Sequence, residues 1–96
     1  MTYNQVINSA PVVLVEFYAS WCPHCRRMMP VVEQVTELLD GSVPVYQFDI
    51  DKEKEKANEA DIQSLPTFII YRNGIQVWRQ SGEMEGEALL ARVQSF

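Results

Sequence analysis

Two cysteines separated by two residues are the most reactive pair in this 96-residue sequence. Cys22, Pro23, His24 and Cys25 follow an apolar segment and begin a segment with helical periodicity. A thiol in the first turn of a helix faces unpaired backbone N–H groups and the positive end of the helix dipole, and both favour the thiolate. We therefore expect a redox pair in which Cys22, at an exposed cap position, is the attacking sulfur. Cys25, about one turn into the helix and more buried, would resolve a mixed disulfide.

Two other interpretations of the cysteine pair remain, a zinc site and a pair of inert thiols. Structural zinc takes about four ligands, whereas the chain has two Cys and one His. We expect no metal and no other bound cofactor. Inert thiols would make the chain a non-catalytic protein-binding module, and thiol titration would distinguish it from a redox protein.

Two polar residues could assist the thiol chemistry. His24 lies between the cysteines, where a charge or a hydrogen-bond donor would favour the thiolate. Glu16 lies among apolar neighbours, and burial raises the pKa of a carboxyl. Such a group suits the role of proton acceptor for Cys25. The alternatives are an exposed helix residue for His24 and a solvent-facing strand residue for Glu16.

The elements that must position these residues follow from the apolar patterns. Pro23 favours a first helical turn, Pro30 is expected to kink that helix, and an Asn-Gly pair at 73–74 predicts a hairpin. Acids near the start of the last helix (Glu83, Glu85 and Glu87) suit its dipole. We expect helices at 3–10, 23–39, 53–60 and 85–93, and strands at 12–18, 43–49, 67–71 and 75–79.

This order of elements predicts the α/β class and a single domain over residues 1–96. The first two strands, joined by a helix, form a right-handed parallel unit. The hairpin adds antiparallel strands, so we expect a mixed central sheet of about four strands, flanked by helices on both faces.

Composition excludes several other classes of protein. The net charge of −5 disfavours nucleic-acid binding, which needs clustered Lys and Arg. No apolar run approaches the ~18 residues that a membrane span needs. The N-terminal residues show no secretory signal. We therefore expect a cytoplasmic monomer, or a protein of an exported compartment if the chain is a trimmed form.

The sequence of residues 15–25, VEFYASWCPHC, resembles the active-site stretch of the thioredoxin family. Further similarities are Pro30, residues 48–51, the Leu-Pro-Thr run at 65–67, the Asn-Gly pair and Gly82. The resemblance implies a thioredoxin fold with a cis-proline loop opposite the active site. It implies exchange with protein disulfides or dithiols, and an upstream redox partner such as a thioredoxin reductase. The substrate contacts that it implies are Trp21, Leu65, Pro66, Ser81 and Gly82.

The departures from that family also carry information. Typical thioredoxins have Gly-Pro between the cysteines, whereas Pro23-His24 resembles bacterial periplasmic disulfide-forming oxidases and, in part, protein disulfide isomerase domains. This predicts a poise more oxidising than that of thioredoxin. Gln47 stands where many thioredoxins have Lys, so a charge partnership with the buried acid is lost. The short N-terminus predicts that the first edge strand of larger members is missing. A glutaredoxin-like, glutathione-dependent reductase is the alternative enzyme.

Overall fold

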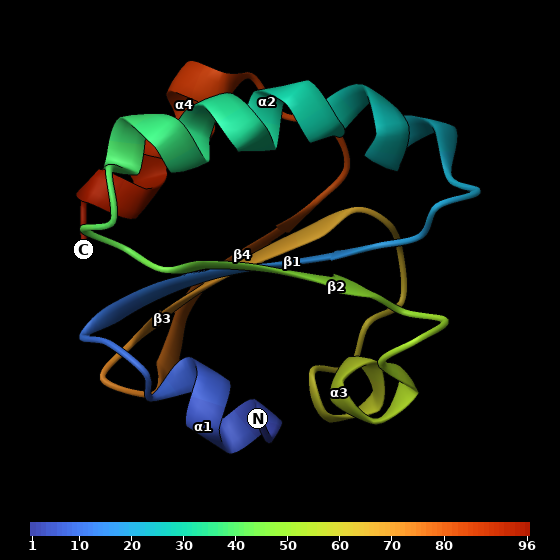
Figure 1. The fold of residues 1–96 in the computed structure, drawn as a ribbon, viewed down its shortest axis with the longest axis horizontal. Coiled ribbons are helices and arrows are strands. Elements are labelled where there is room, and N and C mark those ends of the chain that lie inside the picture. Colours follow the sequence, from blue (N-terminus) through green and yellow to red (C-terminus); the bar gives the residue numbers. More distant parts are fainter.

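The computed structural model describes residues 1–96 as a four-stranded sheet between two layers of helices (Figure 1). The strand order is β2-β1-β3-β4, with β1 parallel to β2 and antiparallel to β3, and with β4 antiparallel to β3. The mixed sheet predicted from the sequence is therefore confirmed. The strands are β1 (Val12–Tyr18), β2 (Val45–Asp49), β3 (Thr67–Arg72) and β4 (Ile75–Ser81).

Four helices cover the two faces of the sheet. Helices α2 and α4 lie together on one face, and α1 and α3 lie on the other (Figure 1). Their bounds are α1 (Tyr3–Ile7), α2 (Pro23–Leu39), α3 (Lys54–Glu59) and α4 (Gly86–Gln94). No helix combines the length and the apolar character that crossing a membrane requires.

The observed bounds differ from the predicted ones mainly at element ends. Helix α1 ends three residues earlier than predicted, because Asn8 caps it and the chain turns before Pro11. Strand β2 begins two residues later, at Val45, which pairs with Leu14. Pro44 has no N–H to donate to a ladder, although its carbonyl accepts from the Leu14 N–H at 3.1 Å. Helix α2 has the predicted bounds and continues through Pro30.

Strand β1 is the centre of the core, as its continuous apolar sequence predicts. Its residues from Val13 to Phe17 are all buried. Because side chains alternate along a strand, Val13, Val15 and Phe17 enter the cluster beneath α1 and α3. Leu14 enters the cluster beneath α2 and α4. Glu16 lies two residues after Leu14, so its side chain is on the same face of the sheet, the face that α2 and α4 cover.

Two connections bring the active-site residues together at one end of the sheet. The first leaves β1 and enters α2, whose N-cap is Cys22. The second leads into β3 through a cis peptide bond between Leu65 and Pro66. The predicted cis-proline loop is therefore confirmed.

Candidate active site

The two cysteines form the first turn of α2. The Cys25 N–H donates to Cys22 Sγ at 3.3 Å, so the Cys22 side chain caps the helix. Both thiols are free. The expectation of an exposed Cys22 is wrong: the residue is only 5% exposed, because Ile50 and Leu65 pack against the cysteine cluster.

Cys25 is the more deeply buried thiol, at 1% exposure. Burial raises its pKa to about 12, and the hydrogen bond to the Cys22 side chain acts in the same direction. The carboxylate of Glu16 contributes a further electrostatic rise. A thiol that stays protonated needs a proton acceptor before it can attack a disulfide.

Glu16 is the buried carboxyl whose charge acts on Cys25. Glu16 is only 2% exposed, and burial raises the pKa of its carboxyl to about 7. The Gln47 side chain opposes this rise, because its Nε2–H donates to Glu16 Oε1 at 2.9 Å. The two residues are opposite each other in the parallel β1–β2 ladder. Gln47 therefore gives Glu16 a neutral hydrogen-bond donor, a bond that the sequence did not predict, although it placed Gln47 at the position that partners the buried acid.

The His24 ring makes its hydrogen bonds with Glu83 and Arg27 and none with a cysteine sulfur. Its Nδ1 lies 2.6 Å from Glu83 Oε2 and 2.8 Å from Arg27 Nη2. Arg27 also donates to both oxygens of Glu83, through Nε at 3.1 Å and Nη2 at 2.9 Å. Hydrogen bonds from Arg27 and then His24 hold the pKa of Glu83 at about 2. Glu83 thus belongs to the active-site helix's surroundings, although its sequence position suggested only a dipole partner for α4.

A largely apolar groove lies beside Cys22. Its volume is about 360 Å³, and its lining comprises Trp21, Cys22, Ile50, Ile62, Gln63, Ser64 and Leu65. Trp21 is 61% exposed, and its Nε1–H donates to Asp51 Oδ2 at 2.8 Å. The groove therefore offers an apolar surface next to the sulfur at the helix cap.

The remaining predicted substrate contacts lie against the cis-proline rather than in the groove lining. The Gly82 N–H donates to the Pro66 carbonyl at 2.8 Å. Ser81 Oγ lies 2.7 Å from Thr67 Oγ1, so the end of β4 is tied to the start of β3. The structure thus brings Pro66, Ser81 and Gly82 together.

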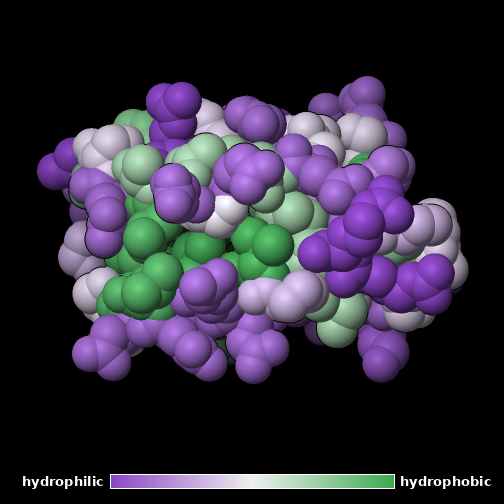
Figure 2. Space-filling view, turned by 90° about the horizontal axis from the view of Figure 1, so that it is seen from above, coloured by the Kyte–Doolittle hydropathy of each residue, from purple (hydrophilic) through white to green (hydrophobic).

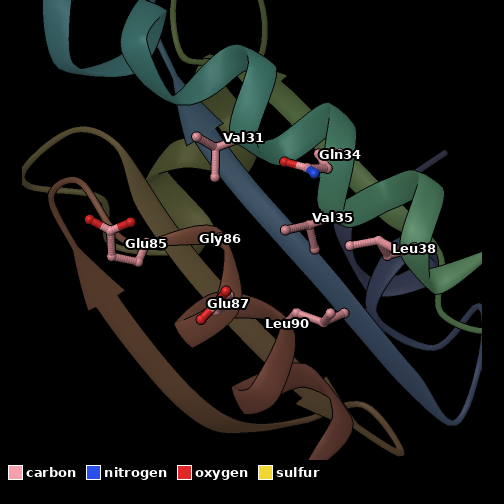
Figure 3. A pocket seen from close by; sticks show the side chains of 8 residues that line it. All are labelled: Val31, Gln34, Val35, Leu38, Glu85, Gly86, Glu87 and Leu90. Atoms are coloured by element: carbon pink, nitrogen blue, oxygen red, sulfur yellow. The ribbon is translucent and has the colours of Figure 1, made fainter.

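A second cavity, of about 490 Å³, lies between α2 and α4 (Figure 3). Figure 2 looks onto the face of the molecule that α2 and α4 cover and shows apolar side chains exposed there. The cavity lining contains neither cysteine nor histidine and comprises Val31, Gln34, Val35, Leu38, Glu85, Gly86, Glu87 and Leu90. Thiol chemistry therefore belongs to the other end of the fold. No group of three or more His, Cys, Asp or Glu side chains is arranged to hold a metal ion.

Comparison with known proteins agrees with this geometry. Residues 1–95 match the family model described as thioredoxin. The chain belongs to the thioredoxin family. A thioredoxin-like protein of the cyanobacterium Synechocystis is 39% identical, with 97% of this chain and 89% of that protein covered. Rice chloroplastic thioredoxin Y is 39% identical over 86% of this chain, which spans only 49% of the rice protein.

Solved thioredoxin structures share the fold. A mutant thioredoxin from Halobacterium salinarum is 31% identical, with a TM-score of 0.87, and 97% of this chain and 80% of that chain are covered. The thioredoxin fold is thus established, and the spacing of Cys22 and Cys25 is that of the family's redox-active CXXC pair.

Proposed function

We propose that this single domain is a protein dithiol–disulfide oxidoreductase that stores two electrons in the Cys22–Cys25 pair. The observation that carries the proposal is the arrangement of three groups. Cys22 caps α2, Cys25 lies directly within hydrogen-bond reach of it, and the buried Glu16 carboxyl acts electrostatically on Cys25. Attack, resolution and proton acceptance therefore each have a group in place.

The reaction proceeds in two exchanges. The Cys22 thiolate attacks a substrate disulfide, which forms a mixed disulfide and releases one substrate thiolate. Cys25 then transfers its proton to Glu16 and attacks the Cys22 sulfur. The second substrate thiolate leaves, the substrate has gained two electrons, and the chain carries a Cys22–Cys25 disulfide. An upstream dithiol, such as that of a thioredoxin reductase, restores the starting state by the reverse exchanges, and no bound cofactor is needed.

The substrate is a protein segment in extended conformation. Trp21 and Leu65 provide apolar contact beside Cys22. The backbone groups of Leu65, which precedes the cis-proline, can pair with such a segment, as an added strand does. The nearby Ser81 and Gly82 extend that surface. These contacts favour protein disulfides over glutathione.

The Cys22–Cys25 couple is more oxidising than that of thioredoxin, whose reduction potential is about −270 mV. Pro23-His24 supports this part of the proposal, since His24 adds an ionisable side chain, bonded to Glu83 and Arg27, to the first turn of α2, where Gly-Pro has none. An effect on the thiolate as large as one charge-assisted hydrogen bond, about 1.5–3 kcal/mol, corresponds to about 30–65 mV for two electrons. Replacing His24 by Pro should lower the potential by that amount in glutathione buffers. An unshifted potential, or a wild-type value at or below that of thioredoxin, contradicts the role of His24.

Turnover of insulin disulfides tests the function itself. We expect reduction with thioredoxin reductase and NADPH to be much faster than with glutathione and its reductase. Faster turnover with glutathione favours the glutaredoxin-like alternative. Two thiols that react with neither system indicate the non-catalytic binding module.

A monomer in the cytoplasm remains our prediction, although the rice relative is chloroplastic.

A further inference from the structure

A cluster of three charged or ionisable residues joins the active-site helix to the loop after β4. Glu83 accepts hydrogen bonds from Arg27 at 2.9 to 3.1 Å and lies 2.6 Å from the His24 ring nitrogen. His24 belongs to the first turn of α2, and Arg27 belongs to the next. Glu83 follows Gly82, whose N–H is bonded to the cis-proline carbonyl. The cluster therefore connects the loop after β4 to the helix that carries the cysteines, and Gly82 connects the same loop to the cis-proline.

The charges of this cluster act on the cysteine pair. Arg27 is always protonated, and the hydrogen bond and negative charge of Glu83 are the main causes that raise its pKa, with a smaller contribution from Cys22. Because His24 lies between the cysteines and Arg27 lies two residues after Cys25, positive charge on this cluster favours negative charge on the sulfurs. The Glu83 carboxylate, bonded directly to Arg27, reduces the positive charge available to the sulfur. The cluster is exposed, so solvent screens each of these effects.

We propose that Glu83 is a positioning residue that holds His24 and Arg27 beside the cysteine pair and lowers the reduction potential of that pair. This inference rests on the proposed function. The measured reaction converts the Cys22–Cys25 disulfide and two glutathione thiols into the dithiol and one glutathione disulfide. Glu83→Gln removes the negative charge that Arg27 and His24 contact beside the dithiol. The reduced form therefore gains stability, and the disulfide becomes a stronger oxidant.

The test is equilibration of the full chain with glutathione buffers at pH 7, followed by alkylation and quantification of the dithiol. Because the cluster is exposed, we expect Glu83→Gln to shift the equilibrium toward the dithiol by about three- to tenfold, or ~14–30 mV. Glu83→Asp keeps the charge and should lie nearer to the wild type. Arg27→Gln should shift the equilibrium toward the disulfide. Glu85→Gln is the matched control, because it removes the same charge two residues away, where the side chain makes no capping bond.

The control separates the cluster from a general effect of net charge. Equal shifts in Glu83→Gln and Glu85→Gln, or no shift in Glu83→Gln, overturn the inference. If Glu83→Gln fails to fold, which urea unfolding would show, the opposite shift of Arg27→Gln decides alone. A wild-type protein that forms no Cys22–Cys25 disulfide in any buffer contradicts the proposed function. A wild type that equilibrates normally beside an unshifted Glu83→Gln contradicts only the role of Glu83.

Discussion

Replacing Glu16 by Gln should remove a pH-dependent loss of stability. The pKa of this buried carboxyl is raised from 4.5 to about 7. A raised pKa means that the folded protein holds the proton more tightly than the unfolded chain. The contribution of Glu16 to stability is therefore fully present below pH 4.5 and is lost as the pH rises through 7. The whole difference corresponds to about 3 kcal/mol, at 1.36 kcal/mol per pH unit.

Most of that loss falls within an accessible pH range. Between pH 5 and pH 8 the wild-type, reduced protein should lose about 2–3 kcal/mol through Glu16. Glu16→Gln has no ionisation to undergo, so its free energy of unfolding should lack that loss. The Gln side chain must still satisfy its polar atoms against Gln47, at a cost of about 1 kcal/mol that does not vary with pH. The change between the two pH values is therefore the informative quantity.

Urea unfolding of wild type and Glu16→Gln at pH 5 and pH 8 measures this change. Glu33→Gln, which removes an exposed carboxylate from α2, is the control for net charge. Equal losses of stability in wild type and Glu16→Gln would refute the burial argument. In single-turnover kinetics at pH 7, Glu16→Gln should slow resolution by about 100-fold, since general base catalysis contributes at least about that much. Attack by Cys22 should change less, and equal slowing of both steps contradicts proton acceptance by Glu16.

Two further predictions concern turns and the substrate surface. Gly41 and Gly74 have φ of 77° and 78°, so alanine at either position should lower the free energy of unfolding by about 1 kcal/mol. Gly74→Ala should cost more, because its methyl group would overlap the Asn8 side chain, whereas Gly41 faces open space; equal costs in urea unfolding contradict this. Trp21→Phe loses the hydrogen bond to Asp51 but should change the unfolding free energy by only about 0.5 kcal/mol, since the ring is exposed. Its rate with insulin should fall more than its rate with a small aliphatic disulfide, and equal falls contradict a substrate-binding role.

Local patterns predicted the elements that carry the chemistry. The apolar run of β1 required a strand covered on both faces, and Pro23 with a downstream 3.6-residue period gave the bounds of α2. The Asn-Gly pair gave the turn between β3 and β4, and both residues have positive φ. Each of these features is determined by neighbouring residues, so a single sequence contains the information.

Contacts between distant residues were not predictable in the same way. Glu83 lies 59 residues from His24, and its carboxylate could equally have served the dipole of α4. The Gln47 amide meets Glu16 only because of the β1–β2 register. Cys22 is buried because two loops fold over it, and no local periodicity describes such loops. These contacts adjust the site, whereas the motif defines it.

Trapping of the mixed disulfide tests the central claim most directly, namely that Cys22 attacks and Cys25 resolves. Cys25→Ser is incubated with a protein disulfide, and intact mass followed by peptide mapping locates any stable adduct. We expect a persistent mixed disulfide through Cys22 in Cys25→Ser and none in Cys22→Ser. Limiting iodoacetamide should likewise label Cys22 first in the reduced wild type. A persistent adduct on Cys25 in Cys22→Ser, with none in Cys25→Ser, would contradict the account.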